Sequence, residues 1–210
     1  MRGVLLFLAA TVGIATPSHA EQKIPKAMQK WLSMTPDDFQ GCINVADDSL
    51  DVTAKLSSES CFKETQGLLK IVWNDNFIRA FVDKKTGKAT YQVYQYISYQ
   101  SPWRFYTTVN YETPDGPKSE LVTEIARNVV SCSGGAFSSG CTLSEHVAFN
   151  ADEALLKTIA LKFSPGQVAG WRFKFGSKAG GDWQDGISAG EVGGILKAVD
   201  RYRLNHNLPR

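Results

Sequence analysis

The sequence predicts an α+β fold: an antiparallel β-meander of five to six strands packed against a C-terminal α-helix, with short N-terminal helices and disulfide staples. Three observations support it. Between residues 68 and 149, apolar and polar residues alternate in short runs separated by turn residues. The last 23 residues begin with a helix start signal and continue with helical apolar spacing. Four cysteines occur as two closely spaced pairs.

The first 20 residues have the layout of a secretory signal peptide. Arg2 precedes the apolar run 4–15, and Ser18-His19-Ala20 has the form of a cleavage site. The run is too short for an ordinary transmembrane helix, and no later stretch is long and apolar enough to be one. We therefore expect a signal peptide over residues 1–20 and a single exported, soluble domain over residues 21–210, periplasmic or secreted.

Charge argues against two classes of partner. The chain has 23 basic and 21 acidic residues, and removal of Arg2 with the signal peptide leaves 22 against 21, a net charge of +1. This balance gives no electrostatic reason to expect nucleic acid or an anionic membrane as a partner.

An oxidising compartment predicts that the cysteines are paired. Three pairings are open, and proximity favours Cys42–Cys61 and Cys132–Cys141. Neither pair has the Cys-x-x-Cys spacing of thiol oxidoreductases, and too few histidines remain for a zinc site. We expect no metal and no cofactor.

Two short helices are expected first, one around Pro25 and one that starts at Thr35, where an N-cap, a first-turn proline and two acids follow one another. Residues 42–66 are ambiguous, with one expected strand at 50–56. The strands of the meander are expected at 68–73, 77–82, 90–99, 103–112, 121–130 and 142–149. Short connections make them antiparallel and exclude a Rossmann fold.

The C-terminal third is expected to hold two helices. Asn150 caps the first, over residues 151–161, and residues 170–175 are a further candidate strand before a Gly-rich loop at 178–186. Ser188 and Glu191 form a capping box for the second helix. Its apolar positions, at helical spacing, are Val192, Ile195, Leu196, Val199 and Tyr202 or Arg203.

The opposite face of this last helix has three glycines, Gly190, Gly193 and Gly194. Each costs about 0.5–1 kcal/mol relative to alanine in a helix interior. Either they are tolerated in the first two turns, where fraying is cheap, or another segment or a partner protein approaches this face closely.

The cysteine hairpin contains the candidate catalytic residue. With Cys132 opposite Cys141, Glu145 is expected opposite Asn128 and His146 opposite Arg127. Neighbours on a strand point to opposite faces, so Glu145 and His146 cannot form a dyad. Ser144 shares a face with His146, but no third group is evident to orient the imidazole, so a serine hydrolase is not favoured.

Glu145 interrupts an apolar strip. Either Asn128 satisfies its carboxylate, or it is a general acid or base with an altered pKa, in company with Asp182 or Asp185.

Tyrosines are the strongest compositional signal, because six of the seven lie between residues 91 and 111. Alternation places Tyr94, Tyr96, Arg104 and Tyr106 on one amphipathic face suited to a small organic, glycan or peptide ligand. Tyrosines also favour strands and pair across them, so a structural role is the competing interpretation.

These observations lead to three functional hypotheses. The first is a non-catalytic binding or cell-envelope accessory protein that uses the tyrosine face. The second is a secreted hydrolase or lyase that uses Glu145. The third is an interaction or inhibitor module whose protein partner contacts Gly190, Gly193 and Gly194. A resemblance to a known family is not evident in the motifs.

Overall fold

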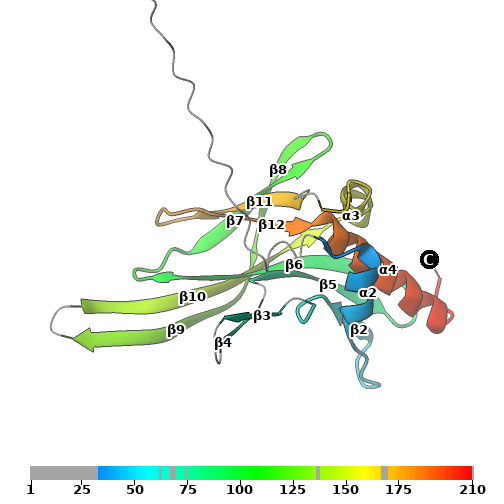
Figure 1. The fold of residues 1–210 in the computed structure, drawn as a ribbon, viewed down its shortest axis with the longest axis horizontal. Helices are drawn as coiled ribbons and strands as arrows, with labels where there is room; N and C mark the ends of the chain where they lie inside the picture. The colour runs from blue at the N-terminus through cyan, green and yellow to red at the C-terminus, as the bar shows by residue number, and fades with distance from the viewer. Residues whose placement is uncertain are drawn as a thin grey trace, which may run out of the picture.

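The protein is built from two antiparallel sheets that face each other, with a long C-terminal helix packed beside them (Figure 1). The computed structural model describes residues 33–61, 63–66, 70–73, 75–135, 138–166 and 170–209. The predicted signal peptide and the expected helix around Pro25 lie outside these residues. No helix within the described ranges combines the length and apolar character needed to cross a bilayer.

The larger sheet has six strands, in the spatial order β1 (Asn44–Ala46), β2 (Thr53–Ser57), β5 (Asn76–Asp83), β6 (Ala89–Gln100), β10 (Ser138–Ala151) and β9 (Thr123–Gly135). The smaller sheet has the order β12 (Trp183–Ser188), β11 (Gly170–Ser177), β7 (Tyr106–Thr113) and β8 (Gly116–Leu121). A separate hairpin is formed by β3 (Lys63–Gln66) and β4 (Lys70–Trp73).

The α+β class, the antiparallel strands and the packing of the C-terminal helix are confirmed. The strands, however, divide between two sheets, because the chain leaves the larger sheet after β6 and enters the smaller one at β7. Four strands were not predicted: β1 and β3, within the ambiguous segment 42–66, and β8 and β12. β8 begins at Gly116, which has a positive φ, and β12 begins at Trp183, within the expected Gly-rich loop and shortly after Gly180 and Gly181, which also have positive φ.

Three helices are described: α2 (Pro36–Cys42), α3 (Glu153–Ala160) and α4 (Ala189–Asn205). Thr35 caps α2 as predicted, in a reciprocal capping box with Asp38. The cap of α3 is Asp152 rather than Asn150, because β10 continues through Ala151 before the helix begins.

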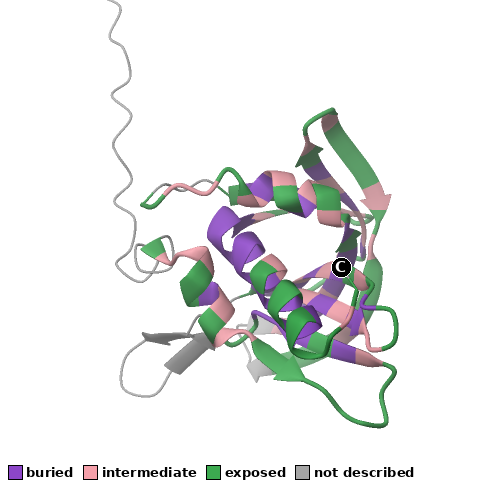
Figure 2. Cartoon of the chain, turned by 90° about the vertical axis from the view of Figure 1, so that its right-hand side faces the viewer, coloured by how far each residue is buried: buried purple, intermediate pink, exposed green. Residues whose placement is uncertain are grey.

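The core lies between the sheets and centres on the ring of Phe149 in β10. The rings of Tyr111, Trp171, Phe173 and Phe175, from β7 and β11 of the facing sheet, lie 5.4–5.9 Å from it. Figure 2 shows the buried residues gathered along the inner sides of the strands and of α4. Burial of these aromatic faces holds the two sheets together.

The glycine face of α4 is covered by α2 of the same chain (Figure 1). A Cβ atom added to Gly194 would overlap Phe39, and one added to Gly193 would lie 3.1 Å from Pro36. Gly190 lies against Met34 and Phe163 in the same way. The glycines therefore allow a close approach, as one interpretation predicted, but an internal segment makes it and this face is not open to a partner.

Both expected disulfides are present, Cys42–Cys61 and Cys132–Cys141. The first joins the end of α2 to the segment after β2. The second joins directly opposite residues of β9 and β10, whose hairpin extends well beyond the rest of the six-stranded sheet (Figure 1).

The pairing of β9 with β10 differs from the expected one beyond the disulfide. A β-bulge shifts the register by one residue just after the two cysteines, so Glu145 lies opposite Arg127 and not Asn128. His146 accordingly lies opposite Ala126 rather than Arg127. A β-bulge has no residue signature as clear as that of a turn, so counting residues from the disulfide predicted the wrong cross-strand partners.

Candidate ligand-binding site

The four residues of the expected tyrosine face do not form one surface. Tyr94 and Tyr96 lie half-buried on the outer face of β6, whereas Tyr106 is in β7 of the other sheet and only 1% exposed. The Tyr106 hydroxyl donates to the Gly181 carbonyl at 2.9 Å, and Arg104 lies over the Tyr99 ring. The division between the sheets separates the two halves of the predicted site.

Tyr94 and Tyr96 instead flank His146. The Tyr94 hydroxyl shares a hydrogen bond with the imidazole Nδ1, the Tyr96 ring lies edge-on at 4.9 Å, and Phe77 stacks on Tyr94 at 4.5 Å. Burial lowers the pKa of His146. The Ser144 hydroxyl is 3.5 Å from Nε2, but Ser144 is only 1% exposed, so a substrate has no access to it as a nucleophile.

Glu145 is buried and accepts hydrogen bonds from four groups. Its carboxylate receives the Tyr99 hydroxyl, the backbone N–H groups of Phe105 (2.9 Å) and Tyr106 (3.2 Å), and Nε of Arg127 (3.1 Å). Burial acts to raise the pKa of Glu145, but these four donors outweigh it and hold the pKa below its usual value.

This arrangement fixes the crossing from β6 to β7, where Phe105 has a positive φ of 57°. Asp182 accepts the Ser177 N–H and Asp185 accepts the Gly186 N–H. Among the described residues, neither aspartate forms a hydrogen bond or ion pair with Glu145. The four hydrogen bonds of Glu145 therefore explain its burial by a structural role.

A cleft of about 800 Å³ is lined by residues of both sheets, of α3 and of α4. Its walls come from the β5–β6 turn and the start of β6, from β7 and β8, and from the junction of β10 with α3, while α4 supplies Arg203. A volume of this size is typical of sites for small organic ligands.

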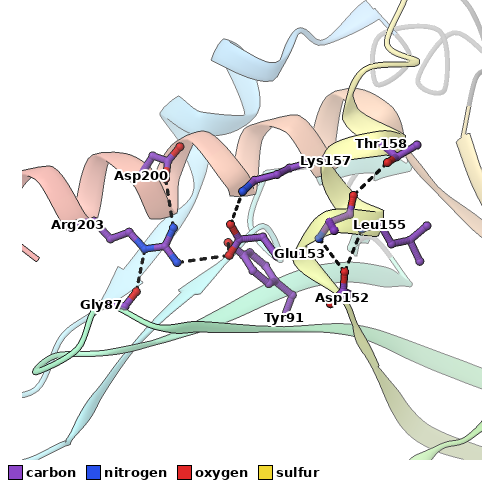
Figure 3. Close-up of polar contacts among 10 residues, drawn as sticks. Gly87, Tyr91, Asp152, Glu153, Leu155, Lys157, Thr158, Asp200 and Arg203 are labelled. Atoms are coloured by element: carbon purple, nitrogen blue, oxygen red, sulfur yellow. Dashed lines mark hydrogen bonds and ion pairs between the residues drawn. The ribbon is translucent and has the colours of Figure 1, made fainter. Parts of the chain in front are cut away.

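The inner wall of the cleft is a network of fixed charges (Figure 3). Arg203 donates from Nε to the Gly87 carbonyl at 2.8 Å, and its two Nη atoms lie 3.3 Å from Asp200 and 3.4 Å from Glu153. The Tyr91 hydroxyl donates to the same Glu153 oxygen as Arg203, at 3.2 Å. Three elements that are distant in sequence, β6, α3 and α4, thus converge on one carboxylate.

Burial and neighbouring charges in this wall shift the pKa values of Glu153 and Tyr91. Burial acts to raise the pKa of Glu153, but a hydrogen bond from Lys157 at 2.7 Å and the nearby charge of Arg203 hold it below its usual value. Burial and the charge of Glu153 raise the pKa of Tyr91. The Glu153 carboxyl group therefore stays ionised and the Tyr91 hydroxyl stays protonated at neutral pH.

The cleft as a whole is electrically balanced. Its lining includes three basic side chains and three acidic ones: Lys88, Lys118, Arg203, Glu120, Asp152 and Glu153. Most are paired within the protein, as Lys118 is with Glu120 and Arg203 with Glu153. No group of three or more metal-ligating side chains occurs among the residues that the structure describes.

Sequence reasoning did not identify this cleft, although one signal for it was available. Arg203 falls at the same helical spacing as the apolar positions of α4, and it is 6% exposed. A buried arginine needs acceptors within the protein, but only the fold reveals that Gly87 and the half-buried Glu153 are among them.

No protein-family model, curated protein or solved structure matches the chain significantly, so a function has to be argued from the chemistry of its sites.

Proposed function

We propose that this is an exported, non-catalytic binding protein that holds a small polar ligand in the cleft beside Arg203. Support for the location comes from the cleft itself, which has a volume of about 800 Å³ and an ordered polar wall. Two disulfides support export, because such bonds persist in oxidising compartments.

A binding role fits this site better than a catalytic one. Glu153 and Arg203 each have several partners inside the protein, and the pKa of Glu153 lies below its usual value, so it is poorly suited to deliver or remove a proton at neutral pH. Fixed side chains of this kind preorganise a site for recognition, since little order has to be imposed when a ligand arrives.

Native mass spectrometry of the protein purified from its own host tests the proposal. A Lys118→Trp variant should block the cleft, because the Lys118 side chain is exposed, lines the cleft and lies over the Tyr111 ring of its wall. Ser119→Trp is the matched control, since it is an exposed position on the same strand outside the cleft lining.

We expect a small-molecule mass on the parent protein and on Ser119→Trp, and its loss from Lys118→Trp. A ligand retained by Lys118→Trp would move the site elsewhere, with the outer face at His146 the first place to look. Complete absence of a small molecule, or a protein partner in its place, would contradict the proposal.

A further inference from the structure

We infer that the ligand of this cleft is a neutral polyhydroxylated molecule, a short glycan or a single sugar, rather than an ion. This inference rests on the proposed function. It is carried by the way in which the charges of the inner wall are arranged, each beside a charge of the opposite sign.

An ionic ligand would meet a like charge at this wall. A ligand carboxylate approaching Arg203 would also approach Glu153 and Asp200, which lie 3.4 Å and 3.3 Å from its guanidinium. A ligand ammonium group approaching Glu153 would face both Arg203 and Lys157. Either ion would have to displace an internal pair or tolerate the repulsion, and at a largely buried arginine both are costly.

A hydroxyl group avoids this conflict because it both donates and accepts hydrogen bonds. Arg203 has five N–H groups, and three bonds to described residues use its Nε and each of its Nη atoms once. The remaining N–H groups can donate to a ligand hydroxyl, and the same or a neighbouring hydroxyl can donate to Glu153. A pair of adjacent hydroxyls therefore extends the existing network without breaking it.

The remainder of the cleft supports the same class of ligand. The Tyr91 hydroxyl, which donates to Glu153, can also accept a hydrogen bond without carrying a charge. The Lys118–Glu120 pair at 2.5 Å is partly exposed and adds little to binding energy in water. A cleft of about 800 Å³ has room for more than one sugar ring.

Calorimetric titration with four probes tests the inference: maltotriose and diacetylchitobiose as neutral saccharides, trialanine as a zwitterion and citrate as an anion. Each is titrated at low and at high salt, because screening weakens ionic binding and leaves neutral binding almost unchanged. We expect a neutral saccharide to bind with a salt-independent affinity that Lys118→Trp abolishes and Ser119→Trp leaves intact.

Glu153→Gln is a second variant that replaces a charged acceptor by a neutral one of the same shape. It should weaken saccharide binding roughly tenfold, the difference between a charge-assisted and an ordinary hydrogen bond. If Glu153→Gln binds the saccharide with unchanged affinity, the inner wall does not take part in recognition and the inference is overturned.

Failure of the inference can be separated from failure of the proposed function. If trialanine or citrate binds instead, with an affinity that falls with salt and is lost in Lys118→Trp, the cleft is a ligand site but the neutral class is wrong. If none of the four probes binds, the glycan inference is overturned, and native mass spectrometry then decides whether the binding function falls with it.

Discussion

Glu145 holds the two sheets together through a single buried carboxylate. Its donors come from β6, from β9 and from the first residues that lead into β7, so it connects both sheets at the point where the chain crosses between them. A buried carboxylate with four donors is stable as an anion, whereas loss of its charge leaves Arg127 without its buried partner.

Glu145→Gln is expected to fold and to lose about 2–4 kcal/mol of unfolding free energy at neutral pH, because it weakens a buried ion pair and directs an amide N–H₂ at existing donors. Urea denaturation measures the loss. A variant as stable as the parent would show that the network contributes little.

The same residue predicts a pH dependence. Because its pKa in the folded protein lies below the ordinary value of 4.5, its contribution to stability is complete above that value and disappears as the pH falls through the lower folded-state pKa. The stability gap between parent and Glu145→Gln should therefore narrow in acid. Denaturation midpoints measured from pH 7 down to about pH 3 test this, and a gap that widens would reverse the assigned sign.

Among the elements, α4 depends on its glycines for packing against α2. Gly194→Ala should destabilise the protein by about 1–3 kcal/mol despite the better helix propensity of alanine, because the new methyl group overlaps Phe39. Gly41→Ala in α2 is the matched control, since no atom lies within 4 Å of its added Cβ. That control should be neutral or stabilising by up to about 1 kcal/mol. Equal effects of the two substitutions in thermal unfolding would refute close packing at Gly194.

The two disulfides act on separate elements and close loops with sequence separations of 19 and 9 residues. Replacing either pair by alanines should cost about 2–4 kcal/mol, with the larger loss for Cys42–Cys61, which closes the longer loop. Denaturant titrations of both double variants under oxidising conditions check the size and the order. Free thiols in the unreduced, unfolded parent protein would contradict both pairings.

At the scale of the whole molecule, the features that depend on local residue patterns were predicted correctly from the sequence. The α+β class, the disulfide pairs, the Thr35 cap and the C-terminal helix all follow from residue spacing and were confirmed. It did not recover the assignment of β6 and β7 to different sheets, because a short connection between strands looks the same whether they pair or separate.

The candidate site could not be predicted because its position depends on how the strands divide between the two sheets. Alternation correctly placed Tyr94 and Tyr96 on one face of β6, but Tyr106 belongs to β7 in the other sheet. The cleft is assembled from a turn, strands of both sheets and two helices, and Arg203 and Glu153 are 50 residues apart in the sequence. No local pattern marks such a pair, since their proximity arises only from the packing of α3 against α4.

The most direct test of the account is an NMR experiment on the ¹⁵N-labelled protein, in which the small-molecule fraction of a host envelope extract is added and the backbone amide shifts are followed. The account predicts that the perturbed amides cluster at the cleft, at Gly87, Thr90, Asn150 and Glu153, and that Lys118→Trp suppresses the perturbations. Perturbations gathered at Tyr94, Tyr96 and His146 instead, or none at all, would contradict the claim that the cleft is the ligand-binding site.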